Sequence, residues 1–265
     1  MPANIFHPKG TEQRKIKWTK LGAGGDAVIK GGKCYLPEEK DSGGHDCVIK
    51  KYNDTPTGRK QFSHVVQTLC IMKHAPEMND YWADIRDIDY KNMTVTTVYL
   101  YSKTLEDIFN EKDIFHAKNT GLLKTILKLL DNLLVTLKAN RIFHGDLHMG
   151  NLYLQQVDEY PDQSRLKVID YDDIEWFQRV KPPTRDLFSA KPGVDRGKMI
   201  NALFSTGRSR LSVIEKRRIC LNICTEIGAT TLEDHFAATM PEDAPDPNEF
   251  VDEEMLKMME SMKMK

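Results

Sequence analysis

Apolar residues follow two different periods along this chain. Between residues 16 and 52, short apolar and β-branched runs alternate with glycine-rich turns, as in "KIKWTKL", "AVIKGGKCYL" and "CVIKKY". Such turn-punctuated runs predict an antiparallel sheet. A later β-branched and aromatic run, "MTVTTVYLY" at residues 93–101, predicts a buried strand.

Helical spacing appears once before residue 102 and dominates after it. Residues 57–75 repeat apolar side chains at helical intervals, and residues 120–140, "TGLLKTILKLLDNLLVTLKAN", predict a long amphipathic helix. The threonine before acidic residues in "TLEDIF" predicts a helix start. Two short strands are expected at "NLYLQQV" and "RLKVIDY", and helices over most of residues 184–240.

This order predicts an α+β protein with a boundary near Ser102. Residues 1–101 are expected to form a sheet-rich part with one helix, and residues 102–240 a mainly helical part. Residues 241–265 combine an acidic, proline-rich linker with a methionine-striped C-terminal helix.

Composition narrows the class of partner. The 265 residues are 40% hydrophobic and 29% charged, with a net charge of −1, so no overall basic field favours nucleic acid or a membrane surface. No apolar run approaches the roughly 18 residues of a membrane span. We therefore expect a cytoplasmic monomer that binds neither nucleic acid nor membrane. The five cysteines lack CxxC pairs and predict reduced, mostly buried thiols.

Candidate chemistry begins with a glycine-rich turn and a lysine. The turn "LGAGGDAVI" at residues 21–29 could bring backbone N–H groups close to a phosphate, although such turns are also common in hairpins. The run "CVIKKY" ends on Lys50, which could face a cleft and pair with phosphate oxygens or simply face solvent. Lys51 is the alternative, because strand alternation points the two lysines to opposite faces.

Two acidic motifs follow later in the chain. In "HGDLHMGN", Asp146 can accept a proton from a hydroxyl, and Asn151 can reach a metal ion. In "VIDYDD", Asp170 ends a buried strand and suits Mg²⁺. A structural turn would explain either motif alone, but it does not readily explain both in this order.

In this order the four elements resemble the protein-kinase-like superfamily. They correspond to a glycine-rich loop, a "VAIK"-type strand, an "H-x-D-x-x-x-x-N" catalytic loop and a "DFG"-type metal motif. The resemblance covers roughly Ile16 to Asp172. It implies a bilobal kinase-like fold, with ATP as the nucleotide and Mg²⁺, or Mn²⁺, as the metal ion.

The resemblance also implies roles for single residues. Lys50 would contact the α- and β-phosphates, Asp146 would be the catalytic base, and Asn151 and Asp170 would hold the metal ion. The remaining residues expected to bind the nucleotide are Gly22, Ala23, Gly24, Gly25 and Ile29 of the glycine-rich loop, and Tyr99, Leu100 and Tyr101 of a hinge.

Several positions depart from the kinase pattern. Gly145 stands where protein kinases usually have an arginine that reads a phosphorylated activation segment, and His148 where Ser/Thr kinases usually have lysine. Asp172 replaces the glycine of the metal motif. The helix at residues 57–75 contains no glutamate, and Gln67 or Thr68 occupies the place of the lysine's usual partner.

These departures leave three functions open. The N-terminal part resembles compact atypical protein kinases of the viral or bacterial-effector type, acting in the host cytoplasm on a protein hydroxyl, with Ser/Thr favoured. The catalytic loop is also similar to that of aminoglycoside- and choline-type small-molecule kinases. A nucleotide-binding pseudokinase is the third possibility, and the residues name neither the substrate nor the regulator.

Overall fold

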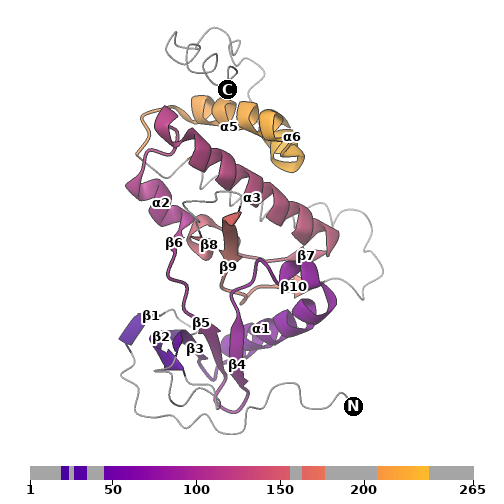
Figure 1. The fold of residues 1–265 in the computed structure, drawn as a ribbon. Coiled ribbons are helices and arrows are strands. Elements are labelled where there is room, and N and C mark those ends of the chain that lie inside the picture. Colours follow the sequence, from indigo (N-terminus) through magenta and orange to yellow (C-terminus); the bar gives the residue numbers. More distant parts are fainter. Residues whose placement is uncertain are drawn as a thin grey trace, which may run out of the picture. The chain divides into compact units, whose positions relative to one another are not determined.

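The computed structural model describes residues 19–23, 27–34, 45–155, 163–176, 204 and 208–238. The described part is α+β, with antiparallel sheets and five α-helices (Figure 1). It divides into two compact units, the first from Met1–Ser102, Asn140–Asp146 and Lys167–Asp195, the second from Lys103–Ala139, Leu147–Leu166 and Arg196–Lys265. The predicted linker and helix at 241–265 lie outside the described residues.

The first unit is built on the predicted antiparallel sheet, which is confirmed. Its strands, in the order β1-β2-β3-β5-β4, are β1 (Thr19–Ala23), β2 (Ala27–Cys34), β3 (His45–Tyr52), β5 (Thr94–Val98) and β4 (Ile85–Asp89). β3 is therefore the central strand, as its apolar sequence "CVIKKY" favours. β4 was not predicted, because three of its five residues are charged and only Ile88 is buried.

The predicted helix of the first unit is α1 (Pro56–His74), which packs against β3. The Thr55 side chain caps it by accepting the backbone N–H of Gly58. α1 buries Phe62 and Val65 of the apolar residues at helical spacing, and it also buries Ile71. Val66, Leu69 and Met72, which share that spacing, are only half-buried, so helical spacing identified the apolar face in part. A two-stranded pairing of β7 (Ile142–Phe143) with β10 (Glu175–Trp176) completes this unit.

The second unit contains the predicted helices α2 (Leu105–Glu111), α3 (Thr120–Ala139), α5 (Val213–Ile227) and α6 (Thr230–Ala238). α2 begins with the expected threonine, because Thr104 accepts the N–H of Asp107 and the Asp107 carboxylate accepts the N–H of Thr104. A sheet of order β6-β8-β9 combines β6 (Lys103–Thr104), β8 (Leu152–Gln155) and β9 (Arg165–Val168).

Helix α3 forms the core of the second unit. It packs against both α5 and α6 (Figure 1). Its buried apolar residues are Leu123, Ile126, Leu127, Leu130, Leu133, Leu134 and Leu137. Each fully buried leucine contributes roughly 1.5–3 kcal/mol, so this face accounts for much of the stability of the unit.

The cysteines do not all behave as predicted. Cys47 on β3 is disulfide-bonded, so the expectation of reduced thiols is wrong at this position. Cys70, Cys220 and Cys224 are free, and the last two are buried on α5. Burial raises the pKa of the Cys224 thiol to about 12, so it stays protonated and packs as a small apolar group.

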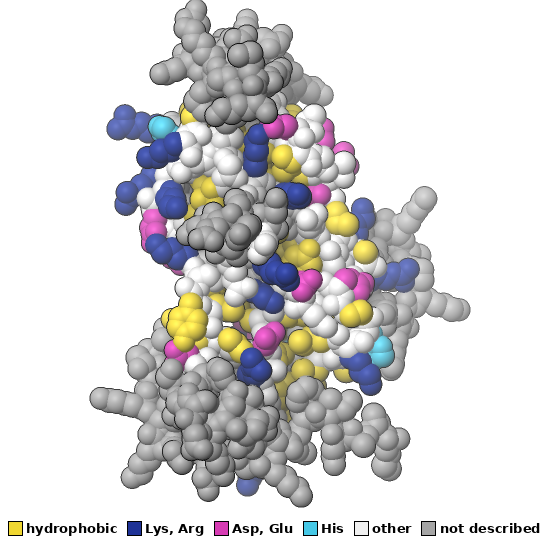
Figure 2. All heavy atoms as spheres, in the orientation of Figure 1, with side chains coloured by type: hydrophobic (Ala, Val, Ile, Leu, Met, Phe, Trp, Pro, Cys, Tyr) yellow, Lys and Arg dark blue, Asp and Glu magenta, His cyan; other side chains and the backbone are white. Residues whose placement is uncertain are grey.

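The described surface carries both signs of charge. On the face that Figure 2 shows, basic and acidic side chains are interspersed among hydrophobic ones, with several basic side chains at the upper left. This mixture agrees with the net charge of −1. Among the described residues, no helix combines the length and the apolar character needed to cross a membrane.

Asp131 on α3 supplies a cap for the start of α6. Its Oδ1 atom accepts the backbone N–H of Leu232 at 2.8 Å, and only 6% of the residue is exposed. The first N–H groups of a helix lack intrahelical acceptors, so this carboxylate links the two helices.

We expect Asp131→Ala to lower the free energy of unfolding by about 1–2 kcal/mol, because a buried N–H loses its acceptor. Urea denaturation measures the change. Asn132→Ala, at the exposed neighbouring position of α3, is the matched control and should change the free energy by less than about 0.5 kcal/mol. Equal effects of the two substitutions would refute the capping role.

Candidate active site

Strand alternation on β3 directs the side chains of Lys50 and Lys51 to opposite faces of the sheet. Lys50 lies opposite Ile29 on β2 and Val95 on β5, and its side chain is 20% exposed. Lys51 is exposed on the other face. Of the two lysines, Lys50 is therefore the one that lies beside Asp170 and Asp172.

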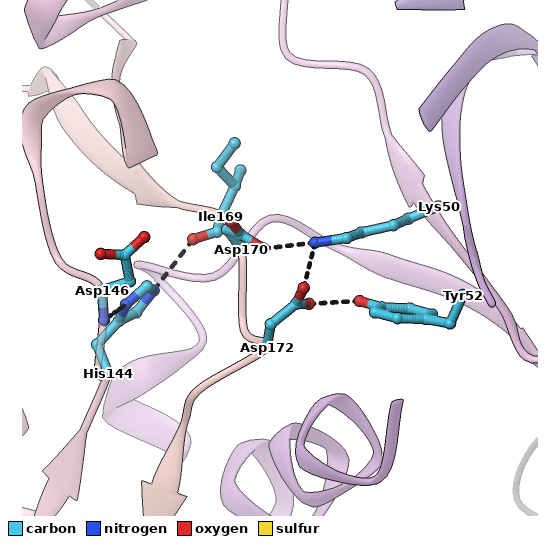
Figure 3. Close-up of polar contacts among 7 residues, drawn as sticks. All are labelled: Lys50, Tyr52, His144, Asp146, Ile169, Asp170 and Asp172. Atoms are coloured by element: carbon cyan, nitrogen blue, oxygen red, sulfur yellow. Dashed lines mark hydrogen bonds and ion pairs between the residues drawn. The ribbon is translucent and has the colours of Figure 1, made fainter. Parts of the chain in front are cut away.

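The Lys50 ammonium lies between two carboxylates (Figure 3). Its Nζ atom donates to Asp170 Oδ1 and to Asp172 Oδ2, each at 2.6 Å. Burial alone lowers the pKa of Lys50, but the two carboxylates outweigh burial and hold this pKa above its ordinary value. Lys50 therefore remains a cation that faces two anionic groups.

Tyr52 completes this cluster from the same face of β3. Its hydroxyl donates to Asp172 Oδ1 at 2.5 Å, and the Lys50 ammonium lies 5.3 Å from the centre of its ring. Burial, followed by the charge of Asp172, raises the pKa of Tyr52, so the hydroxyl remains a donor. Burial and the like charge of Asp170 also raise the pKa of Asp172, against the opposing effect of Lys50.

Tyr171, between the two aspartates, anchors their segment to residues 81–83. Its buried hydroxyl donates to the Val168 carbonyl at 2.7 Å and accepts the Ala83 N–H at 2.8 Å. Its ring meets Trp82 edge to face at 5.0 Å. Val168 also exchanges backbone hydrogen bonds with residues 81 and 83. The backbone on both sides of Asp170 is thus held by buried contacts.

Asp170 has a left-handed backbone, with φ of 64°. Residues other than glycine rarely adopt this conformation, although aspartate tolerates it better than most. Backbone strain of this kind costs on the order of 1–3 kcal/mol and is concentrated at functional sites. Here it accompanies the turn that directs the Asp170 carboxylate to Lys50.

His144 connects the catalytic-loop motif to the metal motif within the first unit. Its Nδ1 atom accepts the Asp146 N–H at 3.4 Å, and its Nε2–H donates to the Ile169 carbonyl at 3.0 Å (Figure 3). His144 is fully buried. It therefore links the backbone of Asp146 to the residue that precedes Asp170.

Gly145 is required by the backbone at its position. Its φ is 88°, and a Cβ atom would lie 2.5 Å from the Asp173 carbonyl oxygen. A side chain cannot occupy this space without displacing the 170–173 segment. The absence of the arginine usual in protein kinases therefore has a local steric reason.

The rest of the catalytic-loop motif belongs to the second unit. Asn151 is 7% exposed, and its N–H donates to the His148 carbonyl at 3.0 Å. His148 Nδ1 accepts the Gly150 N–H at 3.1 Å. A Cβ atom on Gly150 would lie 2.7 Å from Glu106 Oε2 of α2, so this glycine permits the close approach.

The predicted nucleotide-binding residues are described only in part. Gly22 and Ala23 end β1, beside Ile29 and Val28 of β2, whereas Gly24 and Gly25 lie outside the described residues. Ile29 shares its sheet face with Lys50, since the two are cross-strand partners.

The predicted hinge residues directly follow β5. Tyr99 donates its backbone N–H to the Asp46 carbonyl at 3.1 Å, and the Tyr101 hydroxyl bonds the Asp46 carboxylate. The rings of Tyr99 and Tyr101 meet edge to face at 5.1 Å. Leu100, between them, is half-buried.

The sequence motifs do not identify Asp172 and Tyr52 as members of the Lys50 cluster. The motif comparison marks Asp172 only as a replacement for glycine, and it does not include Tyr52. The signal for Tyr52 was its position two residues after Lys50 on a strand, which puts both on one face. No comparable local signal pairs Asp172 with Lys50, since 122 residues separate them.

The described residues contain no cluster of three or more His, Cys, Asp or Glu side chains that could hold a metal ion. Asp170 offers a carboxylate, the ligand type that hard divalent cations prefer, whereas both oxygens of Asp172 are engaged by Lys50 and Tyr52. The Asp170 side chain is 35% exposed, so a ligand could reach it. Asn151, the other predicted ligand, belongs to the second unit.

Neither the protein-family models nor the curated proteins searched with this chain give a match. The functional assignment consequently depends on the chemistry of the residues described above.

We expect Gly145→Ala to lower the free energy of unfolding by at least about 1–2 kcal/mol, because alanine resists this backbone conformation and its Cβ would meet Asp173. Gly121→Ala on α3 is the matched control. A Cβ there has no neighbour within 4 Å, so that variant should be neutral or up to about 1 kcal/mol more stable. Chemical denaturation of both variants decides the matter, and an equally stable Gly145→Ala protein would contradict the steric requirement.

Proposed function

We propose that this chain is an ATP- and metal-dependent phosphotransferase, and specifically a minimal atypical protein kinase that modifies a protein hydroxyl, with Ser/Thr favoured. The observation that supports this most is the 2.6 Å contact between Lys50 and Asp170, which lie 120 residues apart in the sequence. Phosphoryl transfer needs a cation for the phosphates beside a carboxylate for the metal ion.

In the proposed reaction, the acceptor oxygen bonds to the γ-phosphorus as the bond from that phosphorus to the β,γ-bridging oxygen breaks. ADP leaves, and the acceptor hydroxyl proton passes to the Asp146 carboxylate. Lys50 binds the α- and β-phosphates, while His144 orients Asp146 through the backbone contact described above. Catalysis depends mainly on positioning and charge neutralisation.

Asp170 and Asn151 are the proposed metal-holding residues. When bound, Mg²⁺ or Mn²⁺ would neutralise negative charge on the phosphate oxygens. The proposed fold is bilobal and kinase-like, with the first unit as the sheet-containing lobe and the second as the helical lobe. Gly22, Ala23, Gly24, Gly25, Ile29, Tyr99, Leu100 and Tyr101 are proposed to surround the nucleotide.

The loop "HGDLHMGN" supports a second candidate, a small-molecule kinase of the aminoglycoside or choline type. Gly145 and His148 both belong to that pattern. A single assay separates the candidates: incubation with labelled Mg²⁺-ATP, a general protein acceptor, and a panel of amino-alcohol and aminoglycoside acceptors. Label in protein supports the first proposal, label in a small molecule the second, and nucleotide binding without transfer a pseudokinase.

Asp170→Ala and Asp146→Ala should each abolish phosphotransfer while leaving the fold intact, because one removes the metal ligand and the other the proton acceptor. Circular dichroism verifies the fold. Asp173→Ala, an exposed neighbour, is the control and should retain activity. Full activity in either Asp170→Ala or Asp146→Ala would show that the proposed roles are wrong.

A further inference from the structure

Within the described part of the chain, the Lys50 ammonium contacts groups from β3 and from the segment 170–172. We infer that Tyr52 and Asp172 form a positioning pair that orients the Lys50 ammonium for phosphate binding without a carboxylate from α1. This inference rests on the proposed phosphotransferase function and extends it by two residues. It also explains how Lys50 is paired although residues 57–75 contain no glutamate.

The pair is defined by two contacts on one carboxylate. Asp172 Oδ2 accepts from Lys50 at 2.6 Å, and Asp172 Oδ1 accepts from Tyr52 at 2.5 Å. With both oxygens engaged, rotation of the carboxylate would break one contact or the other. Tyr52 is only 2% exposed and has few alternative positions, so it is a rigid donor.

Helix α1 offers no substitute for this carboxylate. It contains no acidic residue, and Gln67, one of the two positions where a partner for the lysine was expected, is exposed. Thr68, the other, is buried but has no carboxylate. Glu77, beyond the helix, is exposed in the short turn Pro76–Met78.

The arrangement couples the lysine to the metal motif. Asp172 is two residues from Asp170, and Tyr171 between them is anchored to Ala83 and Val168. Fixing this segment therefore fixes both carboxylates around Lys50 at once. In kinases whose lysine is paired with a helix glutamate, movement of that helix controls activity. Here α1 supplies no carboxylate to Lys50, and its Phe62 ring packs against the Tyr52 ring with 5.8 Å between the ring centres.

Kinetics provide the first test, with Asp172→Asn and Tyr52→Phe as variants. We expect kcat to fall by about 10- to 100-fold for Asp172→Asn and about threefold for Tyr52→Phe, since small misplacements of a catalytic group are costly. The KM for ATP should change by less than about threefold, because both variants keep the Lys50 charge that attracts the phosphates and lose only its precise orientation. Gln67→Ala and Asp173→Asn are the controls and should match the wild type.

Thermal unfolding provides a second test that needs no activity. Asp172→Asn is measured in the wild-type protein and in Lys50→Met. In the Lys50→Met protein, the change in Tm caused by Asp172→Asn should be at most half of that in the wild type, or of opposite sign. The reason is that the Asp172 carboxylate has already lost its cation there. Gln67→Ala should have the same effect on Tm in both backgrounds.

The two proposals fail separately. A wild-type protein that transfers phosphate to no acceptor refutes the proposed function, while the Tm cycle still tests the pair. An active wild type whose kcat is unchanged by Asp172→Asn and Tyr52→Phe, or is lowered as much by Gln67→Ala, overturns the positioning pair alone. If Asp172→Asn is unfolded at the assay temperature, Tyr52→Phe decides: a kcat about threefold below that of Gln67→Ala supports the pair, and an equal kcat overturns it.

Discussion

A lysine ammonium in the middle of a sheet must be surrounded by anionic groups, and the first unit is arranged around this need. An uncompensated buried charge costs several kcal/mol, and Lys50 on the central strand has two carboxylates within 2.6 Å. Both come from one three-residue segment. Three features hold the backbone at this segment: the anchoring of Tyr171, the left-handed conformation of Asp170, and the hydrogen bond from His144 to the Ile169 carbonyl just before it.

The catalytic-loop and metal motifs are thereby connected through backbone contacts as well as through side chains. His144 joins Asp146 to Ile169, and Gly145 packs against Asp173 closely enough to exclude any side chain. In the sequence, Gly145 stands where protein kinases usually have an arginine. In the structure it is better understood as the residue that lets these two segments approach each other.

Much of the fold could be predicted because it depends on local periodicity. The helices α1 and α3 follow directly from apolar spacing, and the start of α2 follows from a threonine cap. The strand β4 could not be predicted, since its charged residues hide its alternation. In the candidate site, sequence motifs single out Lys50 and Asp170, and the structure brings these two residues into contact. The Tyr52–Asp172–Lys50 contacts could not be predicted, because they arise only when distant segments meet in the folded chain.

Calorimetric titration with Mg²⁺-ATP measures whether Lys50 is the residue that receives the nucleotide. The wild type and Lys51→Met should bind, because Lys51 faces away from the site. Lys50→Met should bind about tenfold more weakly or worse, since loss of a charged hydrogen bond costs about 1.5–3 kcal/mol. Equal affinity of Lys50→Met and the wild type for Mg²⁺-ATP would contradict a nucleotide-binding role for Lys50.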